Sequence, residues 1–197
     1  MIWLTADLHL GHGNMIRHAG RPFRSAEEMD EALIGAINDR VGPDDDLWVL
    51  GDLTMHAPAD AVRAYRARIR CRHVHLVHGN HDTRMRPGGA DGTLEHDVAY
   101  YDGLRSPAGR RMVLCHYPID EWNGLRRGSY MLHGHVHSRG SGLNEAHRGI
   151  GCLRYDVGVD ANGYAPVSAK AIDAWFEGVE PMPLRDWGAH DGGEEGR

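Results

Sequence analysis

The chain has 197 residues, a hydrophobic fraction of 41% and a net charge of -6. This length supports one domain with a core of ordinary size, and the composition, near the average of globular proteins, does not suggest a disordered chain. No apolar run approaches the roughly 18 residues of a membrane-spanning helix, and the first residues lack the pattern of an export signal.

Charge and cysteine content indicate the partners and the compartment. An acidic chain does not favour binding of nucleic acid through bulk electrostatics, although a local basic patch stays open as an alternative. The three cysteines form no closely spaced pair, which favours free thiols in a reducing compartment. We therefore expect a cytoplasmic protein with no membrane partner. The sequence does not specify the oligomeric state.

The first half of the chain alternates strands, polar loops and helices. A buried strand is expected over residues 2–6, and it ends in the glycine-rich segment 7–13. Ser25 and Glu28 match a capping box, and apolar residues at four-residue spacing predict the helix that follows, up to Gly42. These apolar residues are Met29, Leu33, Ile37 and Val41. The next expected elements are a strand at 47–50, a helix from 58 to about 70 and a strand at 74–77.

The second half is predicted mainly as short strands joined by glycine- and proline-rich loops. Strands are expected near residues 95–101, 111–115, 129–133 and 153–159. The one helix expected there spans 168–177, where apolar residues share a face and Gly178 ends the pattern. We expect a single domain over residues 1–178 and a loosely ordered tail over 179–197.

Polar residues follow directly on five of the expected strands. They are Asp7 and His9, Asp52, Asn80 with His81 and Asp82, His116, and His135 with His137. Because parallel and mixed sheets gather the carboxyl ends of their strands at one edge, we expect these side chains to converge. Carboxylate, amide and imidazole groups without a thiolate suit hard or borderline divalent metals. Asp52, near the middle of the set, is the candidate to bridge two ions roughly 3.5 to 4 Å apart.

The strength of this pattern lies in the whole set. Glycine precedes Asp52, Asn80 and His135, which lets the chain turn sharply and approach closely. Because the chain has 15 histidines, a single His-x-His pair such as His73 and His75 is weak support for a metal site. Any one candidate ligand alone is more readily explained as a loop or core residue. Residue types, positions after strands and order agree across the full set, and this agreement favours metal binding.

The ordered motifs resemble those of the calcineurin-like metallophosphoesterase superfamily. Asp-x-His, Gly-Asp, Gly-Asn-His-Asp, a histidine and Gly-His-x-His occur in that order between residues 7 and 137. The segment 5–16 further looks like the small bacterial and phage-type members. The resemblance implies an α/β fold (α+β in some schemes) of the metallo-dependent phosphatase type. This fold is a four-layer αββα sandwich in which two mixed β-sheets are flanked by helices.

The resemblance also implies how the site works. One divalent metal ion would be bound by Asp7, His9, Asp52 and His137, and a second by Asp52, Asn80, His116 and His135. His81 would lie near the scissile phosphate and assist the leaving group, with Asp82 orienting its ring. Manganese is favoured over iron, zinc, nickel and magnesium. The two ions would lower the pKa of a shared water, which attacks phosphorus in line.

The substrate is the least defined part of this prediction. We expect a small phosphate ester, cleaved by a phosphatase or phosphodiesterase activity, and the alternatives are a nuclease and a scaffold without activity. Residues that could contact the substrate phosphate are His12, Asn14, Arg84, Arg126 and Arg139. Turn capping explains His12 and Asn14 equally well, and solvated surface positions explain the arginines.

Overall fold

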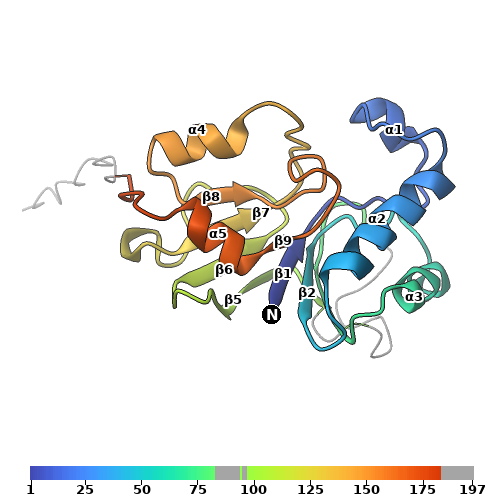
Figure 1. Ribbon diagram of the computed structural model, residues 1–197, viewed down its shortest axis with the longest axis horizontal. Coiled ribbons are helices and arrows are strands. Elements are labelled where there is room, and N and C mark those ends of the chain that lie inside the picture. The colour runs from blue at the N-terminus through green and yellow to red at the C-terminus, as the bar shows by residue number, and fades with distance from the viewer. Residues whose placement is uncertain (83–93, 95–96, 183–197) are drawn as a thin grey trace, which may run out of the picture.

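The computed structural model describes residues 1–82, 94 and 97–182. Its first sheet combines strands from the first half of the chain with one late strand (Figure 1). In the sheet order β4-β3-β2-β1-β9, the strands are β4 (Asp97–Val98), β3 (His73–Val77), β2 (Asp46–Leu50), β1 (Ile2–Thr5) and β9 (Val167–Ser168). Strands β1 to β4 run parallel and β9 runs antiparallel to β1. The carboxyl ends of four strands therefore lie at one edge.

The second sheet is formed by residues from the second half alone. In the order β5-β6-β7-β8, its strands are β5 (Tyr100–Arg105), β6 (Arg111–Cys115), β7 (Tyr130–His133) and β8 (Arg154–Asp156). Strands β6, β7 and β8 are parallel, and β5 is antiparallel to β6. An isolated parallel bridge between Ala6 and Gly158 joins the chain just after β1 to the chain just after β8. The two sheets thus meet where their parallel strands end.

Two helices cover the outer face of the first sheet (Figure 1). They are α2 (Ala26–Arg40) and α3 (Ala59–Arg68). Leu33 of α2 and Val62 of α3 are almost fully buried in the core that these helices share with β2 and β3. The four apolar residues expected on one face of α2 or at its end all belong to this core, as their spacing predicts.

The second sheet is covered more thinly. Helix α4 (Leu143–Gly149) contacts β8, and the short 3-10 helix η1 (Leu125–Arg127) packs near its outer face. A core between the two sheets includes Leu50 and Leu114, and α5 (Ala169–Trp175) contributes to it. The predicted four-layer arrangement, two mixed sheets flanked by helices, is confirmed.

The helix expected after Ser25 is confirmed together with its cap. Ser25 Oγ accepts a hydrogen bond from the backbone N–H of Glu28 at 3.2 Å. The carboxylate of Glu28 accepts from the N–H of Arg24 at 2.8 Å, one residue before the position that a capping box requires. Ser168 caps α5 by accepting from the N–H of Ala171 at 3.1 Å.

Several short elements differ from the expectation. Helices α1 (Asn14–His18) and α4 are not predicted, because 5 and 7 residues are too few to establish an apolar period. The strand expected at 153–159 ends at Asp156, and the strand expected near 95–101 corresponds to β4 and β5. Residues 95–96 of that strand, and 183–197 of the expected tail, lie outside the described residues.

Both halves of the chain contribute to the core between the sheets, from Leu4 and Trp48 to Leu132 and Phe176. This shared core supports the prediction of a single domain over residues 1–178. Within the described ranges, no helix is long and apolar enough to cross a membrane.

Candidate metal centre

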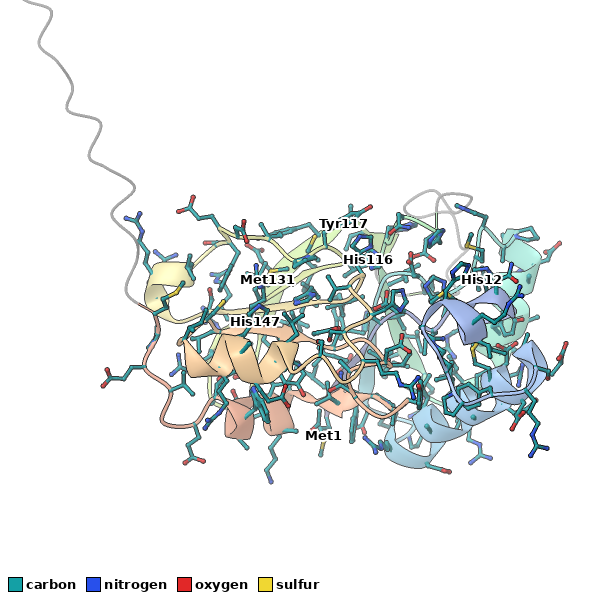
Figure 2. All side chains as sticks on the ribbon, turned by 90° about the horizontal axis from the view of Figure 1, so that it is seen from above. Met1, His12, His116, Tyr117, Met131 and His147 are labelled. Carbon is teal, nitrogen blue, oxygen red and sulfur yellow. The ribbon has the colours of Figure 1, made fainter. Side chains whose placement is uncertain are left out.

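Loops that follow strands of both sheets converge at one site. The N–H of Asp7 donates to the carbonyl of Gly51 (3.0 Å) and the N–H of His9 donates to the carbonyl of Asp52 (2.9 Å), which ties the loops after β1 and β2 together. The N–H of His135 donates to both carboxylate oxygens of Asp7, at 3.1 and 3.0 Å, and this contact links the two sheets. Figure 2 labels His116 and His12, from the two halves of the chain, in the same upper part of the view.

The backbone of this site is strained. Among the described residues, the non-glycine residues with positive φ are Asp7, His9, Asp52, His56, His135, His137 and Tyr164. Five of them are predicted metal ligands, with φ between 46° and 72°. Such conformations are uncommon for residues with a side chain, and they cluster at functional sites where the surrounding structure enforces them. The strain therefore points to a function at these loops.

Glycines next to the predicted ligands allow the loops to pack closely. A Cβ atom on Gly51 would lie 2.2 Å from Nδ1 of His116, and one on Gly79 would lie 2.2 Å from Oδ1 of Asp52. A Cβ atom on Gly134 would lie 2.7 Å from a carboxylate oxygen of Asp7. The expectation that glycine permits close approach at these three positions is confirmed.

His9 offers two buried ring nitrogens to the site. The side chain is 1% exposed, and neither nitrogen has a hydrogen-bond partner within the described structure. Burial lowers the pKa of His9 to about 2, so the ring is neutral at ordinary pH. Its Nε2 lies 3.5 Å from Oδ2 of Asp52, and its ring stacks on that of His137 with centroids 5.3 Å apart. Because an unpartnered buried imidazole is costly, a cation at this point fits the residues present.

His116 presents a second nitrogen to the same oxygen of Asp52. Its Nδ1–H donates to the carbonyl of Leu50 at 2.9 Å, which leaves Nε2 with a free lone pair. Around that Nε2 lie Oδ1 of Asn80 at 3.0 Å, Nδ1 of His135 at 3.2 Å and Oδ2 of Asp52 at 3.5 Å. Electron-rich atoms converge here from three loops, and this donor set also fits a divalent cation.

The acidic side chains are buried as deeply as the histidines. Asp7 and Asp52 are 0% and 1% exposed. Burial raises the pKa of Asp7 to about 8, and the nearby charges of Asp156 and Asp52 add to that rise. Donor atoms of Asp7, His9 and His137 lie within 4.8 Å of one another, as do donor atoms of Asp7, Asp52 and His116. Buried carboxylates in such proximity favour a bound cation.

Asp82 has a different environment from the one that the resemblance implies. Its carboxylate accepts hydrogen bonds from the backbone N–H groups of Asp52 (2.8 Å), Leu53 (3.2 Å) and Gly79 (2.9 Å). Burial raises its pKa. Within the described structure its oxygens therefore tie the loops after β2 and β3 together and do not orient the ring of His81. A contact between this carboxylate and the His81 ring, which the resemblance implies, is not among the hydrogen bonds of the described residues.

His81 lies at the edge of the site, with 28% of its side chain exposed. Its N–H donates to Oδ1 of Asp52 at 2.9 Å, and its Nε2 lies 4.0 Å from Oδ2 of the same residue. On the other side, its Nδ1 lies 3.4 Å from Nε2 of His56, whose N–H donates to the His81 carbonyl at 2.9 Å. The ring is thus held between Asp52 and His56 while part of it faces solvent.

The residues predicted to contact substrate separate into near and distant ones. His12 is partly buried with its ring centroid 5.7 Å from that of His9, and burial lowers its pKa. Asn14 is exposed at the start of α1, where its Oδ1 accepts from Arg17 at 3.2 Å. Arg139 is exposed just after His137.

Arg84 lies outside the described residues. Arg126 is at the wrong end of the second sheet. It belongs to η1, and Gly128 just after η1 accepts a hydrogen bond from Arg110 at 2.9 Å. Arg110 precedes β6, whereas the predicted ligands follow β6 and β7, so Arg126 is separated from them by the length of a strand. This position does not favour Arg126 as a substrate contact, because proximity in sequence to β7 does not specify the end of the strand.

Two buried residues beside the site were missed by the sequence reasoning. Asp160 contacts His137, and Arg21 pairs with Asp160 at 2.8 Å with both side chains fully buried. Asp160 directly follows the strand expected at 153–159, so the rule that selected the other ligand loops could have found it. Arg21 lies in a loop before Pro22 and carries no comparable signal.

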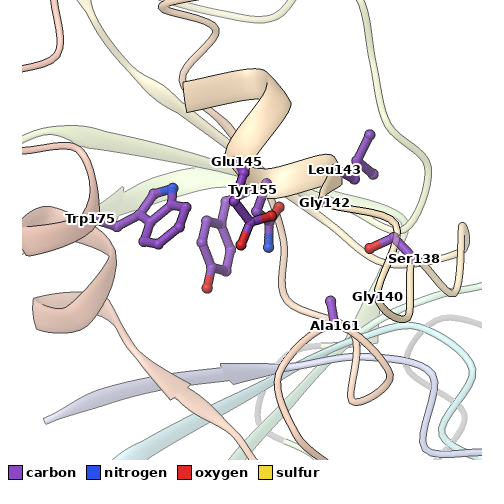
Figure 3. Close-up of a pocket in the computed structure, with 9 residues that line it drawn as sticks. Ser138, Gly140, Gly142, Leu143, Glu145, Tyr155, Ala161 and Trp175 are labelled. Carbon is purple, nitrogen blue, oxygen red and sulfur yellow. The ribbon is translucent and has the colours of Figure 1, made fainter. Parts of the chain in front are cut away.

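The loop after His137 also borders a cavity. Ser138 donates a hydrogen bond to Asp156 and lines a space of about 320 Å³ between α4 and α5, with Glu145, Tyr155 and Trp175 also in its wall (Figure 3). None of the predicted ligands lines this space. The cavity is therefore distinct from the metal centre.

Comparison with known proteins gives a consistent assignment. The model of the calcineurin-like phosphoesterase family matches residues 1–190. An uncharacterized protein of Methanocaldococcus jannaschii is 26% identical over 175 residues, which cover 87% of this chain and 88% of that protein. The Gene 66 protein of Mycobacterium phage L5 is 28% identical over 185 residues, which cover 82% of this chain and 87% of that protein.

A crystal structure shares the fold. The protein of unknown function from Aquifex aeolicus superposes with a TM-score of 0.68 at 21% identity, covering 88% of this chain and 98% of that one. At this identity the likeness concerns the arrangement of the sheets and helices.

Proposed function

Because the chain belongs to the calcineurin-like phosphoesterase family and is a metal-dependent hydrolase of phosphate esters, we propose that it works with two divalent ions that share Asp52. One observation carries this proposal. Nε2 of His9 and Nε2 of His116 approach the same oxygen, Oδ2 of Asp52, each at 3.5 Å and from different sheets. A carboxylate oxygen between two imidazoles is the arrangement expected of a bridging ligand.

The donors divide into two overlapping sets. We place Asp7, His9 and His137 in one set, because their donor atoms lie within 4.8 Å of one another, and Asn80, His116 and His135 in the other, because they meet around Nε2 of His116. We assign one ion to each set, with Asp52 as the shared ligand. The oxygen and nitrogen donors suit manganese, which we favour, as well as iron, zinc, nickel and magnesium.

Two ions bound here would lower the pKa of a water and stabilise the charge that develops on the phosphoryl group. The protein residues fix the geometry around this chemistry. The carboxylate of Asp82 fixes the loop of Asp52 by accepting a hydrogen bond from the backbone N–H of Asp52. The N–H of His81 donates to Oδ1 of Asp52, the carboxylate oxygen that the two imidazoles do not approach. Asp52 is thereby prevented from turning away from the site.

We assign His81 to proton donation toward the leaving group. Its ring is partly exposed beside Asp52 and is positioned by His56, so it can meet a substrate that approaches from solvent. An alkoxide leaving group needs a proton, and a nearby imidazolium can supply it. His12, whose ring lies next to His9, is a second candidate for contact with the substrate phosphate.

The proposed substrate is a small phosphate ester, either a monoester or a diester. All three cysteines are free in the structure, which supports the proposal of a reducing compartment such as the cytoplasm.

The test is to remove metal by chelation, restore individual divalent ions and follow the hydrolysis of aryl phosphate mono- and diesters. We expect chelation to abolish turnover. Added manganese should restore turnover in parallel with the binding of about two ions per chain. The relative rates on the two ester types then identify the activity. Absence of turnover with every divalent ion on both ester types would refute the enzymatic proposal.

A further inference from the structure

A buried ion pair connects two distant segments behind the metal centre. Arg21 precedes α2, and Asp160 follows β8, 139 positions later in the chain. Nε of Arg21 donates to Oδ1 of Asp160 at 2.9 Å, and Nη2 donates to Oδ2 at 2.8 Å. Both side chains are 0% exposed. This bidentate geometry fixes the orientation of the carboxylate.

The same guanidinium also holds the loop that carries two predicted ligands. Nη2 of Arg21 donates to the carbonyl of Asp7 at 2.6 Å, and Nη1 donates to the carbonyl of Leu8 at 3.1 Å. These are the positions where the chain adopts positive φ, at Asp7 and again at His9. Arg21 therefore supports the strained segment from which Asp7 and His9 reach the site.

Asp160 in turn acts on a third ligand. Its Oδ2 lies 2.7 Å from Nδ1 of His137 and accepts the hydrogen bond from that nitrogen. With Nδ1 occupied by the proton, the lone pair of His137 is on Nε2, the nitrogen available to a metal. His116 on the other side of Asp52 is fixed in the same tautomer, but its partner is the uncharged carbonyl of Leu50 at 2.9 Å.

We propose that Arg21 and Asp160 are positioning residues that make the two metal sites unequal. This inference rests on the proposed two-ion function. A carboxylate on Nδ1–H increases electron donation from the histidine to a metal more than a neutral carbonyl does. The site formed by Asp7, His9, Asp52 and His137 therefore binds its ion more tightly than the site that contains His116. Arg21 offsets the buried charge of Asp160, which would otherwise be strongly destabilising.

The test is to measure manganese binding to the metal-free protein by calorimetry, with metal analysis of the dialysed product. Wild-type protein is expected to show a tighter and a weaker site. Asp160→Asn removes the charge at nearly constant size, and it should weaken the tighter site by roughly 10- to 100-fold while the weaker site keeps its affinity. Arg21→Lys keeps the positive charge but loses the fork, and it should weaken the same site to a smaller extent.

A matched control is Asp173→Asn. This carboxylate also accepts hydrogen bonds, from Ser106 and Tyr130, but it lies on α5 away from the metal centre. The control should leave both sites unchanged. If Asp160→Asn does not fold, Arg21→Lys decides the question by the same measurement.

The outcomes separate this inference from the proposed function. Equal weakening of both sites, or no change in either, in a folded Asp160 or Arg21 variant would mean that the ion pair has only a structural role. Wild-type protein that binds fewer than two ions would instead refute the two-ion proposal itself.

Discussion

The candidate site has a buried floor and an exposed rim, and the two are built differently. The floor consists of Asp7, His9, Asp52 and His116, all at most 1% exposed. The rim consists of Asn80, His81, His135 and His12, which are partly or largely open to solvent. Asp7, His9 and Asp52 have a strained backbone with positive φ, Asp52 accepts a hydrogen bond from the N–H of His81, and His116 donates one to the carbonyl of Leu50. A floor fixed in this way suits metal binding, and a rim facing solvent suits substrate and proton exchange.

The floor should respond most strongly to the loss of its shared ligand. Asp52→Asn removes the negative charge between the two groups of donors, so bound metal should fall and turnover should drop by roughly a thousandfold. Metal analysis and turnover of nitrophenyl phosphate measure both effects. Asp173→Asn is the control that should change neither quantity, and full metal content in the Asp52 variant would refute the bridge.

The role of His81 in the rim should appear in how the rate of hydrolysis depends on the leaving group of the ester. His81→Ala should slow the hydrolysis of alkyl phosphate esters by roughly a hundredfold or more, while nitrophenyl esters, which leave without a proton, lose much less. Metal content should stay at the wild-type level, because His81 is not assigned as a ligand. Equal losses on both ester types would count against proton donation.

Metal loading of the floor should depend on pH. Burial raises the pKa of Asp7 from 3.8 to about 8, so at lower pH the metal-free protein holds a proton that an ion must displace. Affinity for manganese should therefore rise with pH, by up to about tenfold per unit for this group, and level off above about pH 8. His9, with a pKa lowered to about 2, adds nothing in this range. Calorimetric titrations at several pH values measure the slope, and an affinity independent of pH would contradict it.

The smallest effects are expected from the arginines. Arg126→Ala should leave KM and kcat unchanged, because η1 lies at the amino end of β7, away from the ligands. Arg139→Ala, just beyond His137, should raise KM by about 3- to 10-fold with little effect on kcat if its guanidinium contacts the substrate phosphate. Steady-state kinetics of this pair would show whether the rim extends to the loop after β7. A larger effect from Arg126 would contradict the position of the site.

The floor was predictable from sequence because each of its residues lies within four positions of the end of a strand. The apolar runs before Asp7, Asp52 and His116 indicate where these strands end, and glycines indicate where the loops pack closely against one another. Asp160 could have been found by the same rule, but Arg21 was missed, because its contact across 139 positions leaves no local pattern.

The contacts of loop side chains and the short elements were less predictable, since side-chain direction in loops depends on tertiary contacts. Asp82 follows the motif that predicted it, yet backbone donors occupy its carboxylate. Helix α4 escaped prediction because polar Asn144 and His147 are its buried residues, which removes the apolar period.

The central claim, two ions sharing Asp52, is tested most directly by anomalous X-ray diffraction from crystals of the manganese-loaded protein. We expect two peaks roughly 3.5 to 4 Å apart, both in contact with Asp52. One should be surrounded by Asp7, His9 and His137, and the other by Asn80, His116 and His135. A single peak, or two peaks of which only one touches Asp52, would contradict the account.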